Sequence, residues 1–168
     1  KRGIMSYHQT GSAQRYREWQ FYCLSGSEVD VDTEEVVGAE AVVRYHHKDL
    51  GIMNRKYLTL LEETKLSHYL DLYVFEEVCK TLRRWESEDL PMIPIAVNFA
   101  GATLRQIDVA EKMTALIEKY HVSCEYLEVE VSESYSDMNQ EMLAETSNKI
   151  RKSNVRVILD TSGQKNPQ

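Results

Sequence analysis

Four residues with oxygen-bearing side chains stand within, or at the end of, short apolar segments of this sequence. They are Glu40, Asn98, Glu130 and Asp160. A buried carboxylate is costly unless something compensates its charge, and three converging carboxylates would repel one another strongly without cations. Carboxylate and amide oxygens are the ligands that Mg²⁺ and Mn²⁺ prefer. The recurrence predicts a divalent-metal site. A helix cap or loop contact explains a single strand-end Asp well, but explains four such residues less well.

Each of these residues lies in a segment that we expect to form a β-strand, because β-branched and other apolar residues dominate it. The expected strands cover residues 19–24, 36–45, 95–99, 126–132 and 155–160. The expected helices cover about 54–64, 68–85 and 103–120, with a last helix ending near Lys152. Strands that alternate with helices of this length indicate parallel β/α units. The sequence therefore predicts the α/β class and a TIM-like (β/α) barrel.

In such proteins the active site lies at the carboxyl ends of the strands. Alternation along a strand places Glu40 and Arg44 on one face, and the other face of each strand is apolar and suited to helices. The polar residues should therefore point into the barrel. Arg44 lies about 13 Å beyond Glu40 along the strand, where it could bind a phosphate or pair with a carboxylate. Glu128 is expected deeper, paired with Arg156 or another cation.

Composition narrows the class of protein. The chain has 168 residues, enough for one domain with a core. Its net charge of −7 argues against binding of DNA, RNA or an anionic membrane surface. We find no apolar run of the roughly 20 residues that a membrane span needs and no signal peptide. The scattered cysteines favour buried free thiols and a cytoplasmic location.

Five segments, in this order and spacing, resemble one known family. Residues 38–45 read G-A-E-A-V-V-R-Y, 61–66 L-E-E-T-K-L, 96–100 A-V-N-F-A, 127–134 L-E-V-E-V-S-E-S and 158–163 I-L-D-T-S-G. They are similar to the G-A-E-A-L-x-R-W, A-E-E-T-G-L, V-N-L-S, L-E-L-E-I-T-E-S and A-L-D-D-F-G segments of EAL domains. These are bacterial phosphodiesterases that hydrolyse cyclic di-GMP. The likeness runs from about residue 19 to 163.

The resemblance implies roles for individual residues. It makes Glu40, Asn98, Glu130 and Asp160 metal ligands, Glu40 also a catalytic residue, Arg44 a contact to the substrate phosphate, and Glu133 a catalytic-site residue that steadies the loop beyond its strand. The family uses two metal ions, Mg²⁺ or Mn²⁺, to activate a water for in-line attack on one phosphodiester bond. The product is linear pGpG.

The sequence also departs from the family pattern. Thr161 stands where the family has a second Asp that helps to hold the second ion, Ser162 replaces a Phe, and a Gln-Pro pair near the first strand is absent. About five of eight strands are present, whereas a whole barrel takes about 250 residues. We therefore expect residues 17–168 to form an incomplete EAL-type barrel, weakly stable and with little turnover. Residues 1–16 are expected to be a linker or the tail of a preceding domain.

Three functional hypotheses remain. The first is a cyclic di-GMP phosphodiesterase domain, and the second is a degenerate EAL module that binds cyclic di-GMP or a protein partner without hydrolysis. An unrelated metal-dependent β/α barrel fits the strand-end carboxylates but not the segment-by-segment likeness. Besides cyclic di-GMP, the partners we consider are a GGDEF domain upstream in a longer parent chain and a second copy in a homodimer.

Overall fold

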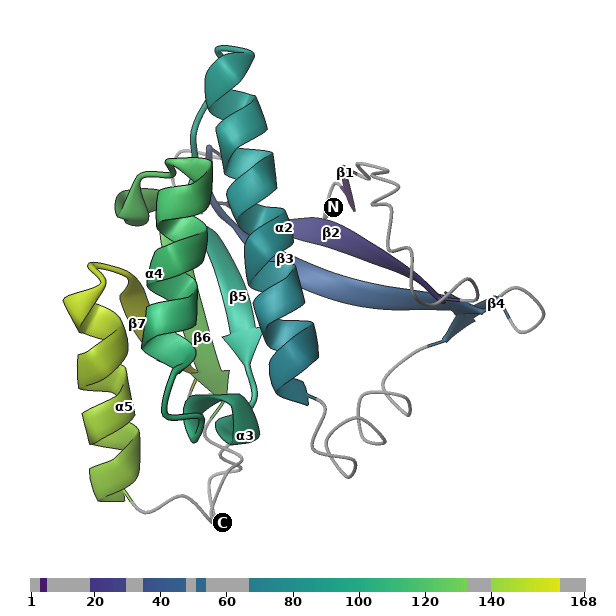
Figure 1. Cartoon of the computed structure of the whole chain (residues 1–168). Helices are drawn as coiled ribbons and strands as arrows, with labels where there is room; N and C mark the ends of the chain where they lie inside the picture. Colours follow the sequence, from purple (N-terminus) through teal and green to yellow (C-terminus); the bar gives the residue numbers. More distant parts are fainter. Residues whose placement is uncertain are drawn as a thin grey trace, which may run out of the picture.

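The computed structural model describes residues 4–5, 19–29, 35–47, 51–53, 67–132 and 140–160, with side chains over 35–42, 67–131, 141 and 144–158. Figure 1 shows its elements. The strands are β1 (Ile4–Met5), β2 (Trp19–Val29), β3 (Val36–His47), β4 (Gly51–Met53), β5 (Ile95–Phe99), β6 (Leu127–Ser132) and β7 (Arg156–Asp160). The helices are α2 (Ser67–Ser87), α3 (Gly101–Leu104), α4 (Val109–Tyr120) and α5 (Gln140–Lys152), with a 3₁₀ turn at Cys124–Tyr126.

The strands form one sheet in the order β1-β2-β3-β5-β6-β7, and β4 pairs with β3 outside this path. The neighbours β3, β5, β6 and β7 are parallel, whereas β2 runs antiparallel to β3. Helices α2, α4 and α5 cover one face of the parallel part, and β2 and β3 extend past them as a long ribbon (Figure 1). The parallel β/α units predicted from the sequence are confirmed.

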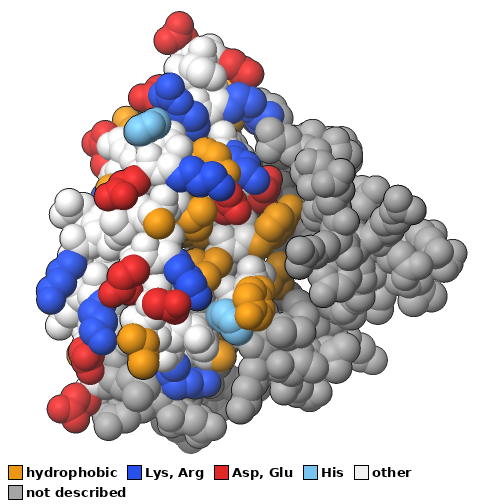
Figure 2. Space-filling view, in the orientation of Figure 1, with side chains coloured by type: hydrophobic (Ala, Val, Ile, Leu, Met, Phe, Trp, Pro, Cys, Tyr) orange, Lys and Arg blue, Asp and Glu red, His pale blue; other side chains and the backbone are white. Residues whose placement is uncertain are grey.

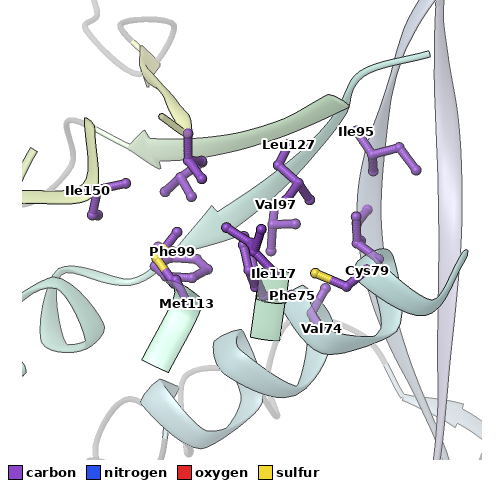
Figure 3. Packing of buried hydrophobic residues seen from close by; sticks show 14 of the residues in the cluster. Val74, Phe75, Cys79, Ile95, Val97, Phe99, Met113, Ile117, Leu127 and Ile150 are labelled. Carbon is purple, nitrogen blue, oxygen red and sulfur yellow. The ribbon is translucent and has the colours of Figure 1, made fainter. Parts of the chain in front are cut away.

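The core lies between the parallel strands and the helices. Alternate residues of β5 and β6 are buried there: Ile95, Val97, Phe99, Leu127, Val129 and Val131. Figure 3 shows Phe75 of α2 and Met113 of α4 packed in the same cluster. Burying one such side chain contributes about 1.5–3 kcal/mol. Because this face is fully apolar, the polar residues of the same strands are left on the opposite face.

Helix α2 closely matches the helix expected over 68–85. The four-residue spacing of Leu70, Val74, Val78 and Leu82 predicts one buried row. Val74, Val78 and Leu82 are buried, and Leu70 is partly buried against the same core. Trp85 is also buried and belongs to the same hydrophobic core. None of the described helices is long and apolar enough to cross a membrane.

The single helix expected over 103–120 is wrong, because the structure divides it into α3 and α4. The chain turns between them, and Ile107 is 88% exposed. The buried stripe of Val109, Met113 and Ile117 belongs to α4 alone. The missed signal was Asp108, a residue type favoured at helix N-termini and located at that position of α4.

Two expectations for the first strands are also wrong. Ser25, Gly26 and Ser27 do not end the first strand, because each pairs with a residue of β3 and β2 continues to Val29. The strand expected over 36–45 does not end at Tyr45, because His46 and His47 also belong to β3 and pair with β4. Ile4–Met5, within the segment expected to be a linker or the tail of a preceding domain, pairs with β2. The helix expected over 54–64 lies outside the described residues.

Candidate functional site

Glu40 and Asn98 are joined by a side-chain hydrogen bond across neighbouring parallel strands. The Nδ2 group of Asn98 in β5 donates to Oε1 of Glu40 in β3, at 2.6 Å. Asn98 is exposed, although Val97 and Phe99 on either side of it are buried. Both side chains therefore lie on the face of the sheet opposite the helices.

Glu130 and Asp160 continue this row on the next two strands. Glu130 of β6 is level with Asn98 in the pairing of β5 with β6, and its neighbours Val129 and Val131 are buried on the helix side. Asp160 of β7 pairs with Ser132, two residues beyond Glu130 on the same face. The structure thus brings the four predicted positions to one face of four adjacent strands. The side chain of Asp160 lies outside those described.

The other two predicted site residues are less fully placed. Arg44 lies four residues beyond Glu40 in β3, with its backbone paired to Tyr22 of β2, and its side chain is outside those described. Glu133 lies outside the described residues, as does Thr161. The roles expected for them remain predictions.

A second polar pair lies one step deeper on this face. Glu128 pairs with Arg156 in the register of β6 and β7, and the Nη1 group of Arg156 donates to Oε1 of Glu128. The Glu128 side chain is only 10% exposed. The expected pairing of Glu128 with Arg156 is confirmed. It compensates a charge that would otherwise be buried without a partner.

Asp71 of α2 is a polar contact near the site that the sequence analysis missed. Its Oδ2 atom accepts hydrogen bonds from the backbone N–H of Ala100, at 2.7 Å, and from the Thr103 hydroxyl, at 2.5 Å. Ala100 directly follows β5, the strand that carries Asn98. The available signal was weak, because Asp71 precedes the buried Val74 by three residues and thus borders the buried face of α2.

Within the described side chains, no three His, Cys, Asp or Glu groups lie close enough together to hold a metal ion. The predicted set of metal ligands does not fall under this criterion. One of its members is the amide of Asn98, and the side chain of another, Asp160, lies outside those described. On the helix side, Figure 2 shows acidic and basic side chains intermingled. Ion pairs such as Lys119–Glu76 and Lys112–Asp108 belong to that surface.

The family model of the EAL domain matches residues 27–168, which is most of the chain. The chain belongs to the EAL domain family. The strand-end row of Glu40, Asn98, Glu130 and Asp160 lies entirely within the matched range.

Two curated relatives of this EAL domain carry informative names. A cyclic di-GMP phosphodiesterase of Pseudomonas aeruginosa is 25% identical over 115 residues, which are 68% of this chain and 19% of that protein. The probable cyclic di-GMP phosphodiesterase PdeA of Escherichia coli is 27% identical over 134 residues, 79% of this chain and 18% of that protein. The EAL domain described here thus spans less than a fifth of the length of either relative.

A solved structure supports the fold. The PaMucR phosphodiesterase in complex with c-di-GMP matches this EAL domain with a TM-score of 0.80 and 20% identity, over 89% of this chain and 61% of that one. The likeness shows that the sheet and its helices are part of a TIM-like (β/α) barrel. The predicted fold class is therefore confirmed.

Proposed function

We propose that this EAL domain binds cyclic di-GMP and hydrolyses one of its phosphodiester bonds to give linear pGpG, with Mg²⁺ or Mn²⁺ as cofactor. The observation that carries the proposal is the hydrogen bond from Asn98 to Glu40, 2.6 Å long, in a row that continues to Glu130 and Asp160. The names of the phosphodiesterase relatives support the substrate and the reaction.

The residues of the row fit a hard divalent cation. Three carboxylates and one amide supply only oxygen ligands, which suits Mg²⁺ and Mn²⁺. Because the amide nitrogen of Asn98 is directed to Glu40, its carbonyl oxygen remains for a cation, and the same hydrogen bond orients the Glu40 carboxylate. When bound, such ions would neutralise the phosphate and supply an activated water.

The remaining residues have supporting roles in this proposal. Arg44, on the face of Glu40 and nearer the carboxyl end of β3, binds a phosphate oxygen through its guanidinium group. Glu133 steadies the chain just after β6. The ion pair of Glu128 with Arg156 lies two residues before Glu130 on β6 and four residues before Asp160 on β7, and it keeps the face beneath these two ligands neutral. We place the protein in the cytoplasm.

The test is the formation of pGpG from cyclic di-GMP, followed by chromatography with Mg²⁺ or Mn²⁺ present. Glu40→Gln removes one ligand charge and should lower the rate by at least about 100-fold, since even outer partners of a metal are worth 10–100-fold. Glu145→Gln is the matched control, because Glu145 is 66% exposed on α5 and pairs only with the surface Lys149 in the described structure. A rate unchanged by Glu40→Gln or by EDTA would exclude the proposal.

A second candidate is binding of cyclic di-GMP, or of a protein partner, without hydrolysis. The observation that favours it is Thr161, which stands where the family pattern has an Asp. Calorimetry with cyclic di-GMP, with and without Mg²⁺, separates the two. Binding without pGpG supports this second function, and a Thr161→Asp variant should then gain turnover.

A further inference from the structure

We infer that Asp71 is a positioning residue for Asn98 and acts through the backbone that follows β5. This inference rests on the proposed function for its consequence in metal binding, but its structural part can be tested separately. Asp71 lies on the second turn of α2, on the helix side of the sheet, whereas the candidate site lies on the other side. Any influence on the site must therefore pass through the chain of β5.

The backbone of Ala100 is held through both its N–H and its carbonyl group. Its N–H donates to the Asp71 carboxylate at 2.7 Å. Its carbonyl accepts the backbone N–H groups of Thr103 and Leu104, at 2.9 and 3.1 Å, where α3 begins. The Thr103 hydroxyl closes the arrangement by donating to the same Asp71 oxygen. Hydrogen bonds to a charged acceptor are about twice as strong as those between neutral groups, so the carboxylate fixes the turn firmly.

A second contact from α2 acts on the same stretch of chain. Phe75 lies four residues after Asp71, on the same face of the helix. Its ring packs edge-on against Phe99, with centroids 6.0 Å apart, and Phe99 is 2% exposed. Helix α2 thus fixes both residues that follow Asn98, one by ring packing and the other by the carboxylate of Asp71.

The position of Asn98 depends on these two residues. Its side chain points to the opposite face, where the 2.6 Å hydrogen bond to Glu40 requires a defined strand position. Releasing Ala100 frees the end of β5 and lengthens or misaligns this bond. The metal ligands Asn98 and Glu40 would then lose their mutual orientation. We expect metal affinity to fall by about as much as when a residue that orients a metal ligand is removed.

The experiment uses the full chain and two readouts. The first is the pair of side-chain NH₂ resonances of Asn98 in a ¹⁵N correlation spectrum, identified by their loss in Asn98→Ala. The second is the affinity for Mn²⁺ by calorimetry. Asp71→Leu and Thr103→Val should shift the Asn98 resonances and weaken Mn²⁺ binding by about 10–100-fold. Thr103→Ser keeps a hydroxyl donor and should restore both.

Thr81→Val is the control, because it removes a threonine hydroxyl that donates to the Glu77 carbonyl elsewhere on α2. It should leave both readouts at their wild-type values. If Asp71→Leu and Thr103→Val lower the free energy of unfolding but move neither readout, Asp71 has only a structural role and the inference is wrong. If the wild-type chain binds no Mn²⁺, the proposed function fails, and the Asn98 resonances still decide whether Asp71 positions that residue.

Discussion

Replacing Asn98 by Asp converts the hydrogen bond with Glu40 into a contact between two carboxylates. In the wild-type chain the amide nitrogen lies 2.6 Å from Oε1 of Glu40. The substitution keeps the shape of the side chain and removes the donor. It therefore tests whether these two side chains meet on the face opposite the helices.

The magnitude follows from the geometry. With charge centres about 4 Å apart and an effective dielectric constant of about 20, the repulsion is about 4 kcal/mol. Asn98 is exposed, so water screens the pair, and we expect about 1–3 kcal/mol to remain. Because each carboxylate disfavours the charge of the other, the repulsion raises the pKa at which the variant pair, titrating as one coupled unit, loses its last proton.

The sign of the pH dependence is fixed by linkage. The folded variant holds a proton at a pH where the unfolded chain has lost it. Its free energy of unfolding therefore falls as the pH rises from the ordinary carboxyl pKa, near 4, through the raised pKa, and stays low above it.

Urea unfolding in metal-free buffer between about pH 4 and pH 8 measures the effect. Asn98→Asp should lose about 1–3 kcal/mol across this range relative to Asn98→Ala, which lacks the hydrogen bond but adds no charge. The double variant Glu40→Gln/Asn98→Asp restores a donor opposite a carboxylate and should lose this pH dependence. If Asn98→Asp and Asn98→Ala show parallel pH curves, the two side chains are not in contact and the reasoning fails.

Three further predictions concern charge and burial elsewhere. Arg156→Gln leaves the buried Glu128 carboxylate without its cation and should cost about 1–3 kcal/mol of stability in urea unfolding; an equal midpoint would contradict this. Burial acts to raise the pKa of Glu76, but hydrogen bonds from Lys119 and a tyrosine hydroxyl outweigh it and hold the pKa below 4.5. Its stabilisation is thus present above that pH and lost as the pH falls through the lowered pKa, so Glu76→Gln should flatten the acid limb of a thermal-stability profile. Burial raises the pKa of the Cys79 thiol to about 12, so iodoacetamide near pH 8 should modify it only after unfolding, as read by mass spectrometry, and rapid modification of the native chain would refute this.

Sequence reasoning located the parallel strands well, because their apolar alternation is strong and local. Residues 95–99 were predicted as a strand with the same bounds that the structure shows. Sequence reasoning failed where contacts with a distant part of the chain decide the local structure. Ser25, Gly26 and Ser27 have weak strand preference, yet β3 supplies a pairing partner for each of them. The turn between α3 and α4 was not predicted, because the helical spacing of apolar residues is regular throughout α4, back to its first residue Val109.

For the site, the sequence could assign faces but not register. Alternation placed Glu40 and Asn98 on the inner faces of their strands, whereas their hydrogen bond joins residues 58 apart and depends on how β3 and β5 align. Asp71 was missed because its partners, the Ala100 N–H and the Thr103 hydroxyl, lie about 30 residues away in the sequence and meet it only through the packing of α2 against the end of β5. The roles of Arg44 and Glu133 stay predictions.

The strand register has a geometrical consequence for the shape of a bound ligand. Glu40 is level with Ala96, two residues before Asn98, and Asp160 is level with Ser132, two residues beyond Glu130. The row therefore climbs about 13 Å along the strands while crossing about 14 Å of sheet, a diagonal near 45°. Strands of a (β/α) barrel are inclined by about 36° to its axis. A diagonal of this slope runs nearly around the circumference, so the four positions stand at almost equal height. A molecule that touches all four must lie flat across the mouth of the barrel.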